Sequence, residues 1–279
     1  MDCSLNAKAA PDQKDYRTTL KPVWCPGCGD FSVLMSITRA MAELGLQRHE
    51  TALISGIGCS SRIPAYTSVY GFHGVHGRAL AIATGVKVAR PDLTVIAAGG
   101  DGDGFSIGGN HFLHSCRRNV DMTYIVMDNE VYGMTKGQAS PTTDSDWKNS
   151  KLTPEGTGVS PVEPVHLAIA AGANFVARGF SGDPNEVARL IAAGIRHPGF
   201  SFVQILSPCV TYRPEQRDWK TMVHKDERPP ASTMPEALHR LAEDDGFSVG
   251  ILYAGKRPPF QPSLKATGSL AEIEGKYVA

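Results

Sequence analysis

The chain alternates between two patterns of apolar residues. Short, nearly continuous apolar runs are typical of buried strands, whereas an apolar residue at every third or fourth position is typical of helices that cover a sheet. The predicted strands are 51–55, 93–98, 122–127, 175–178 and 200–206. The predicted helices are 29–44, 78–90, 109–118, 163–171, one that begins at 183, and one near 234–242. This alternation predicts an α/β fold with a doubly wound, mainly parallel sheet.

Length and composition favour one large domain with shorter segments at its ends. The chain has 279 residues, of which 42% are hydrophobic, and this is enough for one substantial core. After Arg213 the sequence becomes charged and proline-rich, with no strong periodicity outside the short helical stretch. We expect an N-terminal arm over 1–21, a ligand-binding domain over 22–212, and an extended segment over 213–279 that wraps a partner or the chain itself.

Charge and hydropathy exclude some classes of partner. The net charge is zero, so nothing indicates a nucleic acid or another charged polymer. Residues 1–15 are polar, and no stretch approaches the roughly 18 apolar residues that a membrane span needs. We therefore expect a cytoplasmic protein without membrane contact, in which the six cysteines are ligands or core residues rather than disulfides.

The unusual motifs follow the predicted strands. They are the glycine-rich turns 56–59 and 99–104, the polar segment 128–135, and Cys209. In a doubly wound sheet the carboxyl ends of the parallel strands lie along one edge, and ligands bind there. The sequence therefore predicts a binding site at this edge.

The acidic glycine turn indicates a cation. Segment 100–104 reads Gly-Asp-Gly-Asp-Gly, but Ile107 stands where a dinucleotide-binding motif would have its third glycine. Two carboxylates would repel a phosphate, so Asp101 suggests a Mg²⁺ ion between the carboxylate and a diphosphate. Asn129 follows the next strand, 28 residues after Asp101, and can supply a second oxygen. This spacing resembles the thiamine diphosphate motif; the alternative is a surface acidic turn with an ordinary loop asparagine.

Four segments carry a resemblance to a known family. They are 57–59, 76–78, 100–104 and 127–138, and they resemble the β subunits of 2-oxoacid:ferredoxin oxidoreductases over about residues 20–215. The resemblance implies that Mg²⁺ is held by Asp101, Asn129 and the main-chain carbonyl of Val131. It also implies that the thiamine diphosphate is lined by Ile57, Gly58, Cys59, Ser60, His76, Gly102, Asp103, Gly133, Met134 and Thr135.

The cysteines form a candidate metal centre. Cys25 and Cys28 make a CxxC motif just before a predicted helix, whose N-terminus favours the thiolate form. Cys59 and Cys209 lie at strand ends, so four thiolates can hold a [4Fe–4S] cluster, as the resemblance implies. The alternative is a structural zinc, although Cys59 and Cys209 do not form a second CxxC motif. Cys116, within a predicted helix, is expected to be a core residue.

A 2-oxoacid carries a carboxylate, so its pocket needs cationic or hydrogen-bonding side chains. The candidates are His73, His76, Arg78 and Lys136. Lys136 follows the predicted metal loop and resembles a position that contacts the substrate in the family. His76 can bond the cofactor or an intermediate, whereas His73 and Arg78 can equally serve packing or a subunit contact.

The resemblance implies a redox enzyme. The expected reaction is oxidative decarboxylation of a 2-oxoacid to acyl-coenzyme A and CO₂, with electrons passed through the cluster to ferredoxin; the same chemistry can run in reverse as a CO₂-fixing synthase. We favour 2-oxoglutarate as substrate, with pyruvate or a broad 2-oxoacid range as alternatives. Two other readings are a thiamine-dependent decarboxylase or synthase without redox chemistry, and a zinc-stabilised binding subunit without catalysis.

One half of a thiamine site is missing from the sequence pattern. Thiamine enzymes need a second domain whose glutamate contacts the aminopyrimidine ring, and the chain shows no second α/β repeat of that kind. Glu130 lies in the metal loop, on the diphosphate side. We therefore expect an α subunit to supply the pyrimidine domain and its glutamate, in an αβ pair or a dimer of such pairs.

Overall fold

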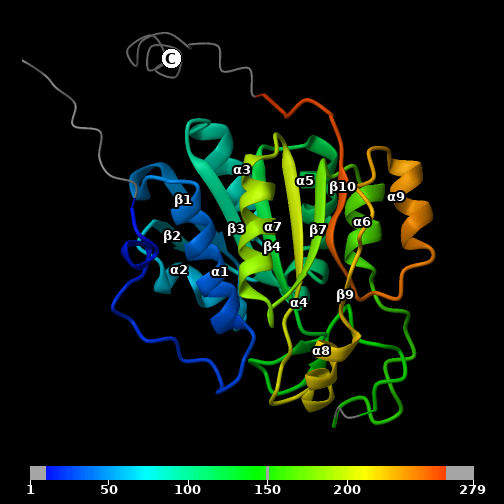
Figure 1. Ribbon diagram of the computed structural model, residues 1–279. Coiled ribbons are helices and arrows are strands. Elements are labelled where there is room, and N and C mark those ends of the chain that lie inside the picture. The colour runs from blue at the N-terminus through cyan, green and yellow to red at the C-terminus, as the bar shows by residue number, and fades with distance from the viewer. Residues whose placement is uncertain (1–10, 149–150, 262–279) are drawn as a thin grey trace, which may run out of the picture.

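The computed structural model describes residues 11–148 and 151–261. Its centre is an eight-stranded sheet in the order β2-β1-β3-β4-β8-β7-β10-β9, with helices on both faces (Figure 1). The strands are β1 Thr51–Ser55, β2 Tyr70–His73, β3 Thr94–Gly100, β4 Met122–Asp128, β7 Phe175–Phe180, β8 Phe200–Leu206, β9 His224–Lys225 and β10 Ser248–Ala254. Only the β7–β10 pair is antiparallel among these neighbours, so the predicted doubly wound, mainly parallel sheet is confirmed.

The helices fall where the apolar periodicity predicts them, within a few residues. The longer ones are α1 Asp30–Glu43, α3 Ala79–Ala89, α5 Gly109–Arg118, α6 Pro164–Ala170, α7 Pro184–Arg196 and α9 Met234–Leu241. Short helical turns are α2 Ile63–Tyr66, α4 Asp101–Phe105, α8 Trp219–Met222, and the 3₁₀ turns η1 Gln13–Tyr16, η2 Arg48–Glu50, η3 Ser60–Arg62 and η4 Pro214–Asp218. At the start of α7, the Glu186 main-chain N–H donates to Oδ1 of Asp183 over 3.1 Å, so Asp183 caps the helix that was predicted to begin there.

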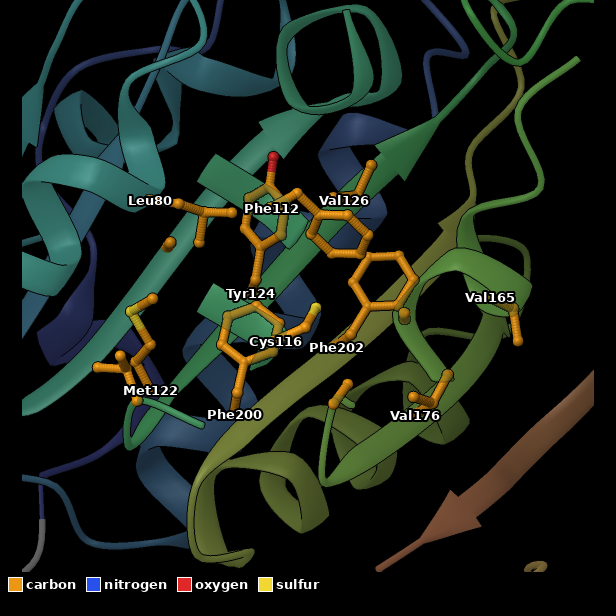
Figure 2. Packing of buried hydrophobic residues seen from close by; sticks show 14 of the residues in the cluster. Leu80, Phe112, Cys116, Met122, Tyr124, Val126, Val165, Val176, Phe200 and Phe202 are labelled. Carbon is orange, nitrogen blue, oxygen red and sulfur yellow. The ribbon is translucent and has the colours of Figure 1, made fainter. Parts of the chain in front are cut away.

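The two faces of the sheet form two separate cores because successive strand residues point to opposite sides. Val126 and Phe202 pack with α3, α5 and α6, whereas Ile125 and Val203 pack with α1 and α7. Figure 2 shows the first of these cores, where the rings of Phe112, Phe200 and Phe202 stack edge to face. Cys116 is fully buried among them, as predicted.

The C-terminal part of the described chain differs from the sequence-based expectation. The helix near 234–242 is present as α9, but Ser248–Ala254 is a strand rather than extended chain, and it pairs with β7. Five of its seven residues are apolar, but the segments on either side are charged and proline-rich, and this surrounding pattern predicted extended chain instead. The sequence reading also missed β2, whose four residues are all exposed at the opposite edge.

Part of the expected N-terminal arm is anchored to the domain. Tyr16 is fully buried, and its hydroxyl donates to the main-chain oxygen of Met41 over 3.1 Å. Residues 1–10, including Cys3, and the end of the 213–279 segment lie outside the described residues. No helix in the described ranges is both long enough and apolar enough to cross a membrane.

Candidate active site

The predicted cofactor residues meet in one cavity at the carboxyl ends of β1, β3 and β4. The cavity has a volume of about 90 Å³. Its lining is Ile57, Gly58, Cys59, Ser60, His76, Gly100, Asp101, Gly102, Asp103, Asn129, Val131, Tyr132, Gly133, Met134 and Thr135. Every residue that the sequence reading assigned to the cofactor or to Mg²⁺ is in this set. Gly100 and Tyr132 complete it and were not predicted.

The register of two strands explains why Asp101 and Asn129 lie together. β3 and β4 are adjacent and parallel, with Gly100 opposite Met127, so the residues after each strand emerge side by side. Asp101 begins α4, and Asn129 begins the turn that leads into the hairpin of β5 (Val131–Tyr132) and β6 (Gln138–Ala139). The Asn129 side-chain oxygen accepts the Val131 main-chain N–H over 3.2 Å.

Burial makes the charge on Asp101 costly. The side chain is 2% exposed, and burial, followed by the nearby Asp128 carboxylate, raises the pKa of Asp101 to about 7. Burial also raises the pKa of Asp128. A cation beside Asp101 would favour the ionised form, so this donor set fits a divalent ion that prefers oxygen ligands. Across the described residues, no three side chains of His, Cys, Asp or Glu are grouped closely enough to hold a metal by themselves.

Asp103 joins three loops of the cavity. Its Oδ1 accepts the main-chain N–H groups of Ile57, over 2.9 Å, and Gly77, over 2.7 Å, and lies 3.4 Å from Nδ1 of His76. A Cβ atom at Gly56 would lie 1.9 Å from Oδ2 of Asp103, so the turn after β1 requires glycine there. Asp103 lines the cavity, but its carboxylate is used to hold the surrounding main chain.

Tyr132 determines the shape of the acidic glycine turn. Its hydroxyl donates to the main-chain oxygen of Gly102 over 3.2 Å, and a Cβ atom at Gly102 would lie 2.2 Å from its ring. Close packing of an aromatic ring on the turn therefore requires glycine at 102. The short motif around Tyr132 contained this residue, but its contact with residue 102 depends on the fold.

The four candidate substrate-binding residues are not all at the cavity. His76 lines it, whereas His73, Arg78 and Lys136 do not. Arg78 precedes α3, and its guanidinium donates to the main-chain oxygens of Gly77 and Ile107, each over 3.3 Å. Lys136 is exposed on the β5–β6 hairpin with a left-handed main chain, φ 79°, a conformation that carries strain for a non-glycine residue.

The four predicted cluster ligands line a second cavity of about 240 Å³. Cys25, Cys28, Cys59 and Cys209 all border it. It shares Cys59, Asn129, Gly133 and Met134 with the first cavity. A Cβ atom at Gly133 would lie 3.7 Å from the sulfurs of both Cys59 and Cys209, so one turn of the chain separates the two cavities.

The expected lowering of the thiol pKa at the helix N-terminus is wrong for Cys28. Burial, together with the negative charge of Asp30, raises the pKa of Cys28 above its usual value. Burial likewise raises the pKa of Cys59 to about 11 and raises that of Cys209. Burial outweighs the partial charge of α1 here. The chain alone does not favour thiolates at these positions, so a thiolate form would need positive charge from a bound group.

Comparison with known proteins identifies the family. Residues 56–205 match the thiamine pyrophosphate enzyme family, C-terminal TPP binding domain. A 2-oxoacid:ferredoxin oxidoreductase subunit beta from Sulfolobus sp is 41% identical, over 91% of this chain and 92% of its own length. The 2-oxoglutarate oxidoreductase subunit KorB of Mycobacterium tuberculosis is 48% identical over 70% of this chain. That match spans only 52% of the relative's length, and a 48% identical β subunit from Aeropyrum pernix is matched over 64% of its length.

A solved structure agrees with these relatives. It is a 2-oxoglutarate:ferredoxin oxidoreductase from Magnetococcus marinus with 2-oxoglutarate, coenzyme A and succinyl-CoA bound. The two chains superimpose with a TM-score of 0.87 at 42% identity, over 98% of this chain and 92% of the other. The family match covers the cavity at the ends of β1, β3 and β4, and the cavity lined by the four cysteines shares Cys59, Asn129, Gly133 and Met134 with it. The chain therefore belongs to the β-subunit family of the 2-oxoacid:ferredoxin oxidoreductases.

Proposed function

We propose that this chain is the thiamine diphosphate-binding β subunit of an enzyme that oxidatively decarboxylates 2-oxoglutarate to an acyl-coenzyme A and CO₂. The observation that carries the proposal is the shared wall of the two cavities. A buried carboxylate on one side and four cysteines on the other meet at Cys59 and Gly133. A decarboxylase without redox chemistry would need the first cavity alone, and a zinc-stabilised binding subunit would need the second alone.

Asp101, Asn129 and the Val131 carbonyl would hold Mg²⁺, and the glycine turns of the cavity would admit the diphosphate close to the main chain. The bound cofactor supplies the carbon chemistry that releases CO₂. His76 would donate a hydrogen bond within the cavity, while Asp103 holds its loop in place. Lys136 would bind the substrate carboxylate from the exposed hairpin.

Cys25, Cys28, Cys59 and Cys209 would hold a [4Fe–4S] cluster. Such a cluster provides an electron acceptor beside the thiamine site, which zinc cannot do. Ferredoxin would then receive the electrons, and coenzyme A would take the acyl group. The M. marinus structure, which contains 2-oxoglutarate and coenzyme A, supports 2-oxoglutarate over pyruvate as the substrate.

The cavity at the ends of β1, β3 and β4, here called the cofactor cavity, is small, and its volume supports the presence of a second subunit. At about 90 Å³ it is well below the roughly 300–1,000 Å³ of pockets that enclose a whole ligand of this size. We infer that an α subunit closes it with a pyrimidine-binding domain and the glutamate that domain provides, in an αβ or (αβ)₂ enzyme located in the cytoplasm.

Metal and activity measurements test the proposal. The chain, co-expressed with its α subunit and purified without oxygen, should contain iron and acid-labile sulfide, together with thiamine diphosphate and magnesium. It should reduce ferredoxin only when 2-oxoglutarate and coenzyme A are both present. Stoichiometric zinc without iron, or decarboxylation without electron transfer, would contradict the proposed function.

A further inference from the structure

A buried hydroxyl cluster lies behind the cofactor cavity. After β6 the chain turns back beneath the ends of β3 and β4, and the side chains of Ser140, Thr142 and Thr143 are all buried there. None of them lines the cofactor cavity. Thr142 instead borders a larger polar cavity of about 430 Å³ on the other side of Asp128.

Thr142 connects the two buried carboxyl groups. Its Oγ1 lies 3.0 Å from Oδ2 of Asp101 and 2.8 Å from Oδ1 of Asp128. Thr142 is 6% exposed, so water does not substitute readily for this contact. A hydroxyl has one hydrogen, so it donates to one carboxylate oxygen at a time, and both oxygens lie within its reach.

The far side of this bridge is fixed by the neighbouring strands. Oδ2 of Asp128 accepts from Nε2 of Gln204 over 2.8 Å, and Oε1 of Gln204 accepts from Nε of Arg178 over 2.9 Å. Gln204 and Arg178 belong to β8 and β7, which are central strands of the sheet. Through Asp128, Thr142 is thus connected to a rigid part of the molecule.

The cluster also holds the turn that carries Asn129. Oγ1 of Thr143 donates to the main-chain oxygen of Glu130 over 2.6 Å, and it accepts the Ser140 main-chain N–H over 2.7 Å. Glu130 has a left-handed main chain, φ 54°, so this turn needs outside contacts to keep its shape. One short segment therefore contacts the ends of β3 and β4, two of the three strands that border the cofactor cavity.

We propose that Thr142 is a positioning residue of the cation site, acting through Asp101. Its hydroxyl fixes the side-chain rotamer of Asp101 before the cation arrives, so that the binding free energy is not spent on ordering this carboxylate. The inference rests on the proposed magnesium site. It adds to that site a residue that touches neither the cation nor the cofactor.

Three substitutions at one position separate the hydroxyl from the shape of the side chain. Thr142→Val keeps the branched shape without the hydroxyl, Thr142→Ser keeps the hydroxyl, and Thr142→Ala removes both with no added bulk. Thr221→Val is the matched control, because Thr221 is exposed and its hydroxyl makes a comparable bond, 2.8 Å to the main-chain oxygen of Asp218.

The measurement is cation binding to the assembled enzyme in the presence of thiamine diphosphate, with Mn²⁺ followed by electron paramagnetic resonance and Mg²⁺ as competitor. Thermal unfolding is recorded in parallel on the same samples. Thr142→Val should raise the cation concentration for half-saturation about tenfold or more, as for a lost bond to a charged group, and Thr142→Ala should do the same. Thr142→Ser and Thr221→Val should bind as the unsubstituted enzyme does.

Other results would contradict the proposed role of Thr142 or the proposed magnesium site. Unchanged cation affinity in Thr142→Val or Thr142→Ala, even with a lower unfolding temperature, would give Thr142 a purely structural role and overturn the inference. Equal weakening by Thr142→Ser would show that the hydroxyl is not responsible, and would also overturn it. If Thr142→Val does not fold, Thr142→Ala and Thr142→Ser decide. Absence of Mn²⁺ binding in the unsubstituted enzyme would refute the proposed magnesium site itself.

Discussion

Replacing Asp101 by asparagine should separate stability from cofactor binding. The substitution preserves the shape of the side chain and one oxygen, but it removes a charge that is buried next to Asp128. Because burial is the main cause of the raised pKa of Asp101, the ionised carboxylate destabilises the cofactor-free protein. Asp101→Asn should therefore leave that protein at least as stable near neutral pH, while Mg²⁺-dependent binding of thiamine diphosphate is lost.

The magnitude follows from the pKa. An increase in the pKa of Asp101 from 3.8 to about 7 corresponds to roughly 4 kcal/mol of free energy of unfolding lost by ionisation. This penalty is shared between Asp101 and its neighbour Asp128. The folded protein binds this proton more tightly than the unfolded chain, so the group costs nothing below pH 3.8. Its penalty grows as the pH rises from about 4 to about 7, and it is complete above that range.

Thermal unfolding from pH 5 to pH 8, with and without Mg²⁺ and thiamine diphosphate, measures both effects. The cofactor-free protein should lose more stability toward pH 8 than Asp101→Asn does. At pH 8 the ligands should raise the unfolding temperature of the unsubstituted protein but not that of Asp101→Asn. Asp146→Asn, at an exposed carboxylate, should behave as the unsubstituted protein. Equal stabilisation of Asp101→Asn by the ligands would refute the metal assignment, and an identical pH dependence would refute the account of burial.

Three further outcomes are expected. Cys209→Ser should lose iron and sulfide, whereas Cys116→Ser should retain both and only lower the unfolding temperature, since Cys116 lies in the core; equal iron contents would exclude Cys209 as a ligand. Lys136→Ala should lower kcat/KM for 2-oxoglutarate roughly ten- to a hundredfold, the effect of one charge-assisted hydrogen bond, with nearly unchanged cofactor affinity; normal kinetics would place Lys136 outside the pocket. The chain purified without an α subunit should not reduce ferredoxin, and addition of that subunit should restore the reaction; full activity of the chain alone would disprove the two-subunit arrangement.

The grouping of residues around the cavity at the strand ends could be predicted because it depends on local sequence and on one simple rule of topology. Asp101 and Asn129 each follow a strongly apolar strand, and carboxyl ends of adjacent parallel strands lie side by side. The glycines of the turns were visible for the same reason. Cys116 was predicted to be buried from its helical position alone, and it is fully buried.

Contacts between distant segments could not be predicted in this way. Ser248–Ala254 has apolar residues at five of its seven positions, but the charged and proline-rich sequence around it obscures the strand, and its pairing with β7 depends on the fold. The helix N-terminus next to Cys28 suggested an acidic thiol, but the surrounding fold buries that thiol and reverses the effect. Thr142 looks like an ordinary loop residue until the chain brings it against Asp101.

The sequence by itself determined most of the elements, the class of fold and the residue types at the strand ends, because hydrophobic periodicity and short motifs depend on neighbours along the chain. Only the tertiary structure decided how those ends are used. It placed Cys59 and Gly133 in the wall between two cavities, and it turned the carboxylate of Asp103 toward main-chain N–H groups. Burial and hydrogen-bond partners come from segments far apart in the chain, so they exist only once the sheet has assembled.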